Sequence, residues 1–406
     1  MSEHLETAGA PGPPIPDNRI LVISRIGCPP PIGGNRTRMA ALLREMRRLG
    51  YQVHFAGIRM SAEEKSVTQS MVDEYVWNFN YVPPPMGVAR LRASLAYRSR
   101  RWLRHFRFME EPLDETIYDH WLGEARDLQQ QRQYSRVLVS YVYHSKFFLA
   151  FPDPCLRILD THDAFSNRQE QLRAGKVDGY WRSHSPEDEK RGLLRAQRII
   201  AIQEPEAAYF RRLLGPRSES EVQTIGHLAD PISDFPPPVS FPALGYLGSN
   251  TAINVRGLQW FLREVWPHVR SRLPKAELWV AGTVCDKCEP SPGVQIRGKI
   301  SHLADFYREC PVLINPVRAG TGISIKTIEA LMHGRPVVST RVGVEGMEAF
   351  LGHGLFVCDS ADEFANTAVN LLSNLSQAQQ FGEEALRLAQ SYMAENRRVL
   401  AAVLSK

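Results

Sequence analysis

The chain repeats one pattern twice: a short apolar run, a turn of small residues, and a longer segment with apolar residues at helical spacing. The first copy starts at Arg19–Ser24, continues with an expected helix over 35–49, and ends in a second apolar run at 52–56. The same alternation resumes at Leu244–Gly248. Strand–helix–strand units build parallel sheets that are covered by helices. The sequence therefore predicts an α/β fold with two Rossmann-like, doubly wound lobes and a cleft between them.

Length and composition place the boundaries of these lobes. A chain of 406 residues is long enough for two cores, and residues 1–17 are polar and rich in Pro and Gly, as in a disordered tail. Residues 230–242 contain five prolines in thirteen positions, as expected of a linker. We therefore expect an N-terminal lobe over 18–229 and a C-terminal lobe over 243–380. Residues 381–406 are expected to form C-terminal helices that pack back on the N-terminal lobe.

Hydropathy, cysteine usage and charge restrict the compartment and the partners. No apolar run reaches the roughly 18–20 residues of a membrane span, and the start of the chain lacks the apolar core of a signal peptide. The six cysteines are scattered, which favours free thiols in the cytoplasm. Cys285 and Cys288 lack the further ligands that zinc requires, so no metal is expected. A net charge of +5 is weak, and we expect no nucleic-acid partner.

One local stretch, 88–109, departs from this near-neutral balance. Between Arg90 and Arg107 it holds seven arginines and one histidine, with no acidic residue, and its apolar residues recur at helical spacing. A basic amphipathic helix of this kind fits peripheral contact with an anionic membrane surface. The same pattern is equally expected of a helix that binds an acceptor carrying a lipid diphosphate. It is also expected of an ordinary helix that packs on a sheet and exposes its basic face to solvent.

The most informative segment is Asn315–Ser339. An apolar strand ends at Asn315, a loop with Gly320, Thr321 and Gly322 follows, and a helix is expected to start near Gly322. The start of a helix presents unpaired backbone N–H groups and the positive end of the helix dipole. Such an arrangement at the end of a parallel strand suits a diphosphate.

Two charged residues of the expected helix give this segment its chemistry. Gly322, Lys326 and Glu329 are spaced at i, i+4 and i+7, so they are expected on one face. Lys326 would neutralise the phosphates of a nucleotide. Glu329, one turn further, would accept hydrogen bonds from a ribose diol.

This segment resembles the donor-binding signature of the retaining glycosyltransferases of family 4, which have the GT-B fold. The likeness extends to Leu244–Gly248, the helix start at 254–262, Val294–Lys299 and Gly343–Gly346. It covers almost all of the C-terminal lobe and the N-terminal lobe only in patches. The resemblance implies that a nucleotide sugar binds in the C-terminal lobe. It also implies an acceptor on the N-terminal side, which is a glycan, a lipid-linked molecule or another hydroxyl compound.

The chain departs from the family pattern at two places. The family often has two glutamates eight residues apart; Glu329 matches the second, which binds the ribose, but Thr321 stands at the first. The basic residues that often follow the first strand of the C-terminal lobe are absent from Ser249–Asn254. Lys326 is then the best phosphate cation. The other expected donor-binding residues are Gly320, Thr321, Gly322, Glu329, Arg318 and Lys299.

Two glycines in the N-terminal lobe follow the first expected strand. Gly33 and Gly34 resemble the family's glycine-rich loop, which lies near the donor phosphate and the acceptor, although a plain turn is the alternative. Arg36 comes next and is expected to meet an anionic group near a helix start. The pair is not a G-x-G-x-x-G motif, so it does not favour a dehydrogenase.

The segment Asp160–Asp163 follows another expected strand, at the end that should face the cleft. It resembles the family's short polar segment, whose histidine lies beside the transferred sugar. We expect His162 to hydrogen-bond the sugar or orient the acceptor hydroxyl, and Asp163 to fix its tautomer, with Asp160 as a second candidate. A core or capping histidine is the alternative.

These observations favour an enzyme that transfers a sugar from a nucleoside diphosphate to a hydroxyl acceptor in bacterial glycan or glycoconjugate biosynthesis. Retention of configuration follows from the resemblance alone. No cofactor is expected, because Lys326 and the helix start supply the positive field otherwise asked of a metal. The alternatives are a nucleotide-sugar epimerase or phosphorylase on the same fold, and a non-catalytic nucleotide-sugar-binding subunit of a polysaccharide assembly complex.

Overall fold

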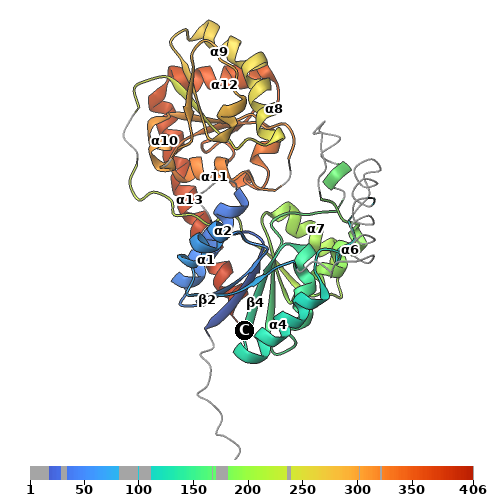
Figure 1. Cartoon of the computed structure of the whole chain (residues 1–406). Helices are drawn as coiled ribbons and strands as arrows, with labels where there is room; N and C mark the ends of the chain where they lie inside the picture. Colours follow the sequence, from blue (N-terminus) through green and yellow to red (C-terminus); the bar gives the residue numbers. More distant parts are fainter. Residues whose placement is uncertain are drawn as a thin grey trace, which may run out of the picture.

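A computed structural model shows two α/β lobes, each built on a parallel sheet (Figure 1). The described residues are 18–28, 34–81, 99, 111–166, 168–170, 182–235, 239–300, 302–320 and 322–405. Four features expected from the sequence lie outside them: the tail 1–17, Gly33, Thr321, and all but one residue of the basic stretch 88–109. No helix among the described residues has both the length and the hydropathy to cross a membrane.

The N-terminal lobe has a seven-stranded sheet in the order β3-β2-β1-β4-β5-β6-β7, and all its strand pairs are parallel. The direction of strand order reverses between β1 and β4. Its elements are β1 (Arg19–Ser24), α1 (Gly34–Arg48), β2 (Gln52–Ile58), α2 (Ala62–Gln69), β3 (Glu74–Phe79), α4 (Asp119–Arg132), β4 (Arg136–Ser140), η1 (Val142–Ala150), β5 (Leu156–Asp160), α6 (Pro186–Leu193), β6 (Arg198–Ala201), α7 (Glu204–Leu214) and β7 (Glu221–Thr224).

The C-terminal lobe has a six-stranded parallel sheet in the order β10-β9-β8-β11-β12-β13, and its strand order reverses between β8 and β11. Its elements are β8 (Ala243–Leu247), α8 (Ala252–Trp260), η2 (Phe261–Val265), α9 (Trp266–Arg272), β9 (Glu277–Ala281), η3 (Thr283–Lys287), β10 (Val294–Gly298), α10 (Leu303–Glu309), β11 (Val312–Asn315), α11 (Ile325–Met332), β12 (Val337–Ser339), η4 (Arg341–Val344), η5 (Glu348–Phe350), β13 (Leu355–Val357), α12 (Ala361–Ser373) and α13 (Leu375–Leu404). The expected pair of doubly wound lobes is therefore confirmed.

The apolar periodicity of the sequence places the helices on the sheets. In α1, the buried residues Met39, Leu42, Leu43 and Met46 recur at spacings of three and four, so one stripe of the helix faces the sheet. Strand β1 is buried on both faces, as expected of a central parallel strand. One apolar cluster joins α1 and β1 to α11 and α13, so the core continues from one lobe into the other.

The last helix, α13, connects the two lobes (Figure 1). Near its start, Gly382 packs against the backbone of Gly334 in the C-terminal lobe. At its end, the Leu404 carbonyl accepts hydrogen bonds from Tyr51 (3.1 Å) and Arg136 (2.6 Å) in the N-terminal lobe. The boundary expected between residues 380 and 381 falls inside this continuous helix, so no break in secondary structure marks it.

The segment that leaves β7 is held by α13 at Gly226. The Gly226 N–H donates to Asn396 Oδ1 (2.8 Å), and a methyl group on Gly226 would overlap the Tyr392 hydroxyl. Only a residue without a side chain fits between the segment and the helix. This contact sets the start of the connection between the lobes.

We predict that Gly226→Ala lowers the free energy of unfolding by about 1–3 kcal/mol, because Tyr392 has to move away from the new methyl group. Thermal and denaturant unfolding of the purified variant measure the change. The matched control is Gly123→Ala in α4, where the added methyl group meets no atom within 4 Å. That control should be neutral or stabilise the helix by up to about 1 kcal/mol. Equal effects of the two substitutions would contradict the packing described for Gly226.

Candidate donor and acceptor site

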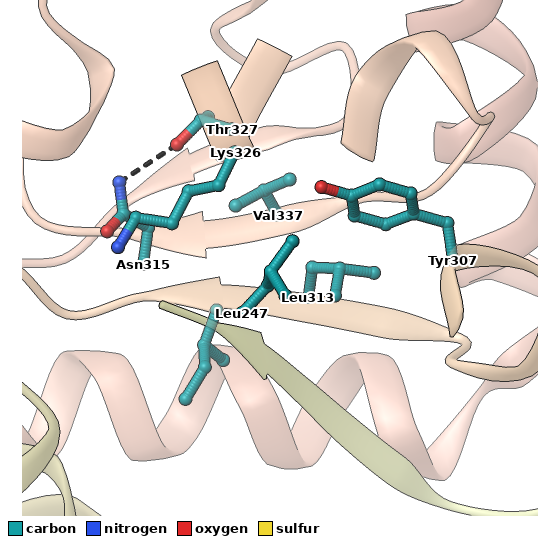
Figure 2. Close-up of a pocket in the computed structure, with 8 residues that line it drawn as sticks. Leu247, Tyr307, Leu313, Asn315, Lys326, Thr327 and Val337 are labelled. Carbon is teal, nitrogen blue, oxygen red and sulfur yellow. Dashed lines mark hydrogen bonds between the residues drawn. The ribbon is translucent and has the colours of Figure 1, made fainter. Parts of the chain in front are cut away.

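A pocket lies beside the point where the C-terminal sheet reverses its strand order. Ligands of doubly wound sheets bind at such switch points. The pocket is lined by Leu247, Tyr307, Leu313, Ile314, Asn315, Lys326, Thr327 and Val337. Figure 2 shows Lys326 and Asn315 at one end and the Tyr307 ring at the other. Its empty space of about 200 Å³ includes open solvent, so the enclosed part is too small for a whole nucleotide sugar, which would extend out of it.

Lys326 is a cation held by neutral groups. Its Nζ donates hydrogen bonds to Asn254 Oδ1 (2.6 Å) and to the Tyr246 hydroxyl (3.4 Å), and lies 4.8 Å from the centre of the Tyr246 ring. The Asn254 Nδ2 donates to the carbonyl oxygen and the hydroxyl oxygen of Ser249. These bonds orient Asn254 Oδ1 toward Lys326. Burial lowers the pKa of Lys326 to about 7. Within the described chain no carboxylate pairs with Lys326, so a bound phosphate would be its first counter-ion.

Glu329 lies one turn further along α11, in contact with both lobes. The Tyr307 hydroxyl donates to Glu329 Oε2 (3.3 Å), and His227, which follows β7 of the N-terminal lobe, has Nε2 3.5 Å from Glu329 Oε1. The carboxylate is 13% exposed, so its remaining acceptor positions are narrowly accessible.

The glycine loop before α11 differs from the expectation at one point. We expected the helix to start near Gly322, but α11 begins at Ile325, and Gly322 has the left-handed φ of +76°. Gly322 therefore does not lie on the helical face of Lys326 and Glu329. The Asn315 Nδ2 donates to Ser324 Oγ (2.9 Å), so Asn315 contacts the residue just before the helix.

Two expected donor-binding cations lie at the surface of the C-terminal lobe. Arg318 is exposed and stacks over the Trp260 ring at 5.0 Å. Lys299 is exposed and directly follows β10. No described contact joins either residue to Lys326 or Glu329. Their assignment to the donor stays a prediction.

The first turn of α1 brings the N-terminal lobe against α11. A methyl group on Gly34 would lie 2.9 Å from Ile325 Cδ1, so the two helix starts are in contact across the cleft. Arg36 points elsewhere: its guanidinium pairs with Glu64 on α2 at 2.9 Å. The expectation that Arg36 meets a phosphate is therefore not supported by its position, because a carboxylate already compensates its charge.

His162 lies at the carboxyl end of β5, with only 8% of its surface exposed. Its Nε2 is 3.0 Å from Asp160 Oδ2, an electrostatic contact whose geometry is not that of an aligned hydrogen bond. Its ring packs on Tyr141 with centroids 4.5 Å apart. Its φ of +60° is unusual for a residue with a side chain, and conformations of this kind concentrate at functional sites.

Asp163 does not orient His162. Its Oδ2 pairs with Arg168 at 2.7 Å, and Asp160 takes the orienting position instead. Asp163 faces the other lobe: a methyl group on Gly322 would lie 3.7 Å from Asp163 Oδ1 and 3.8 Å from the His162 carbonyl oxygen. The structure thus brings the glycine loop, His162 and Asp163 together at the cleft.

Several residues of this site have no signal in the sequence. Tyr246, Asn254 and Tyr307 hold Lys326 and Glu329, but each is an ordinary residue of a strand or helix. Arg38, which binds Asp160, lies 122 positions from its partner along the chain. Across the described ranges, no group of three or more His, Cys, Asp or Glu is placed to hold a metal ion.

Comparisons with known proteins concern the family and the fold. Residues 241–374 match the model of the family described as glycosyl transferases group 1. The C-terminal lobe is therefore similar to a group 1 glycosyltransferase domain. An uncharacterised 44.6 kDa protein in the cps region of Klebsiella pneumoniae is 27% identical over 135 residues, which are 30% of this chain and 35% of that protein. The match thus spans about a third of this relative.

Solved structures extend the likeness to both lobes. Sucrose-phosphate synthase of Thermosynechococcus elongatus has a TM-score of 0.64 at 15% identity, covering 95% of this chain and 96% of that one. HepE of Anabaena, in complex with UDP, has a TM-score of 0.65 at 13% identity, covering 95% and 99%. A variant of S. aureus TarM, crystallised with UDP, α-GlcNAc-glycerol and fondaparinux, has a TM-score of 0.66 at 10% identity, covering 96% and 100%. The chain therefore has the GT-B fold.

We predict that Lys326→Met raises the melting temperature at pH 6, by the equivalent of on the order of 1 kcal/mol. Because the folded-state pKa of Lys326 lies near 7, below its unfolded value, the charged lysine destabilises the fold most below pH 7. The penalty falls as the pH rises above 7, so the advantage of methionine should shrink at pH 9. The exposed Lys299→Met is the control and should change little. A loss of stability in Lys326→Met at pH 6 would contradict a desolvated, uncompensated cation.

Proposed function

We propose that this protein is a glycosyltransferase that moves a sugar from a nucleoside diphosphate to a hydroxyl acceptor. The observation that carries the proposal is Lys326, a partly buried cation that pairs with no carboxylate of the described residues. It lies beside the switch point of a lobe that matches the group 1 glycosyltransferase model. A fold that keeps such a cation at a cost in stability is expected to use it on an anionic ligand. The diphosphate of a nucleotide sugar is that ligand.

The donor would lie across the C-terminal lobe, with its diphosphate at Lys326 and its ribose at Glu329. Glu329 accepts from Tyr307 already, which leaves acceptor positions on its two oxygens for a diol. Both HepE and TarM were crystallised with UDP, which makes uridine diphosphate the first nucleotide to test. Thr321 stands where the family often has its first glutamate. The residues around His162 would therefore recognise the sugar.

His162 would act on the reacting sugar and the acceptor hydroxyl. Asp160 holds the Nε2 side of its ring, which leaves Nδ1 as the other polar atom of the imidazole. A hydrogen bond donated by a sugar hydroxyl to His162 Nδ1 would strengthen as positive charge develops on the sugar in the transition state. Closure of the lobes would exclude water and limit hydrolysis of the donor.

The proposal includes the stereochemistry of the transfer, its independence of a metal, the acceptor and the location of the enzyme. The resemblance to family 4 supports transfer with retention of configuration. The cation at Lys326 and the backbone N–H groups before α11 supply positive field for the leaving diphosphate, which supports a metal-independent reaction. HepE crystallised with glucose and TarM with α-GlcNAc-glycerol support a sugar or glycan acceptor, and with it a place in glycan biosynthesis. We also propose a cytoplasmic enzyme that works at the inner membrane surface.

A thermal-shift screen with nucleoside diphosphate sugars tests donor binding. We predict that a uridine diphosphate sugar raises the melting temperature of the native protein, since a ligand at 100 times its Kd adds about 2.7 kcal/mol. Glu329→Ala should abolish the shift because the ribose loses its carboxylate. The control is Glu384→Gln. Glu384 is a surface carboxylate that contacts His353, and this variant should keep the full shift. No shift with any nucleotide sugar, or an unchanged shift in Glu329→Ala, would sink the proposed donor site.

Product analysis separates transfer from the other reactions of this fold. Incubation of a binding donor with glucose or GlcNAc-glycerol as acceptor should release the nucleoside diphosphate and form a glycoside. An epimerase would instead leave the nucleotide linked to a changed sugar. Binding without any turnover would identify a non-catalytic subunit.

A further inference from the structure

Arg38 occupies a position from which no ligand can be reached. It lies in the first turns of α1 and is 1% exposed, so its charge is fully enclosed by protein. Its Nε and Nη2 donate to Asp160 at 2.6–3.3 Å, and its Nη1 donates to the carbonyls of Ile225 (3.0 Å) and Gly226 (2.8 Å). A guanidinium is suited to such a set of planar contacts, whereas a lysine is not.

One partner of Arg38 leads to His162. Asp160 is fully buried, and its Oδ2 lies 3.0 Å from His162 Nε2. Burial alone would raise the pKa of Asp160, but the Arg38 guanidinium and the His162 ring lower it below its usual range. The carboxylate therefore stays charged and favours the imidazole tautomer with its proton on Nε2. Without Arg38, a buried carboxylate would lose its counter-ion and its fixed position.

The other partners of Arg38 lead to the connection between the lobes. Ile225 and Gly226 directly follow β7, and Gly226 is also held by Asn396 of α13. The next residue, His227, is fully buried and lies 3.5 Å from Glu329 in the C-terminal lobe. We call residues 225–227 the hinge segment. The Arg38 guanidinium thus contacts both Asp160, which lies beside His162, and the start of the hinge segment.

We propose that Arg38 is a positioning residue, which holds Asp160 and thereby His162 in register with the hinge segment. The proposal rests on the proposed function for its effect on catalysis. Its effect on the state of His162 is independent of any substrate.

The first test is nitrogen-15 NMR of the imidazole of His162 in the full chain, assigned with His162→Asn. The native protein should show the tautomer with the proton on Nε2. Arg38→Lys and Asp160→Asn should both show a mixture of tautomers. Arg397→Lys, which weakens an ion pair between α13 and Glu45 away from the cleft, is the control and should keep the native signal. A native signal in Arg38→Lys would overturn the proposal.

The second test is a double-mutant cycle on glycosyl transfer. We expect Arg38→Lys to lower kcat by about 10- to 100-fold and to change the donor KM by less than about threefold, because only the reacting histidine is misplaced. In the His162→Asn background the same substitution should have no further effect. Additive losses in the double variant would show that Arg38 acts only through stability and would overturn the proposal. If the native protein transfers no sugar while the NMR result holds, the proposed function fails and the positioning of His162 stands.

Discussion

The buried ion pair between Arg38 and Asp160 is the constraint on which the cleft depends. It joins the first helix of the N-terminal lobe, the end of β5 and the segment that leads out of β7, three elements that are far apart in the chain. Loss of one partner from such a pair costs roughly 3–5 kcal/mol, because the other charge stays buried. The main effect of the pair is therefore to restrict these elements to one arrangement, not to add stability. Asp160 of this pair also contacts His162, the residue that we propose acts on the sugar.

The C-terminal lobe differs, because its enclosed lysine, Lys326, pairs with no carboxylate among the residues that the structure describes. Lys326 is enclosed by Tyr246 and Asn254, which hydrogen-bond it without neutralising it. The two lobes thus differ: one holds Asp160 against His162 through an ion pair with Arg38, and the other encloses a lysine in neutral groups. The glycine loop, which packs against His162 and Asp163, is where the two meet.

The sequence predicted the features that depend on local pattern, and it missed those that depend on contacts between distant residues. Apolar periodicity was enough to predict the two sheets. The spacing after Asn315 predicted that Lys326 and Glu329 lie on one helix, and both lie on α11. Their roles in donor binding stay predictions. The start of α11 was placed too early, and the hydrogen bond from Asn315 to Ser324 just before this helix has no local signature. Asp163 was preferred over Asp160 for the same reason: only the folded chain shows that Arg168 engages the first and Arg38 the second.

We propose that the C-terminal lobe binds the diphosphate of a nucleotide through Lys326. Calorimetric titration of the native protein and of Lys326→Met with UDP and with UMP tests it most directly. The native protein should bind UDP at least about tenfold more tightly than UMP, a difference of about 1.4 kcal/mol, and Lys326→Met should lose that preference. Equal affinity for UDP and UMP in the native protein, or an undiminished preference in the variant, would contradict the account.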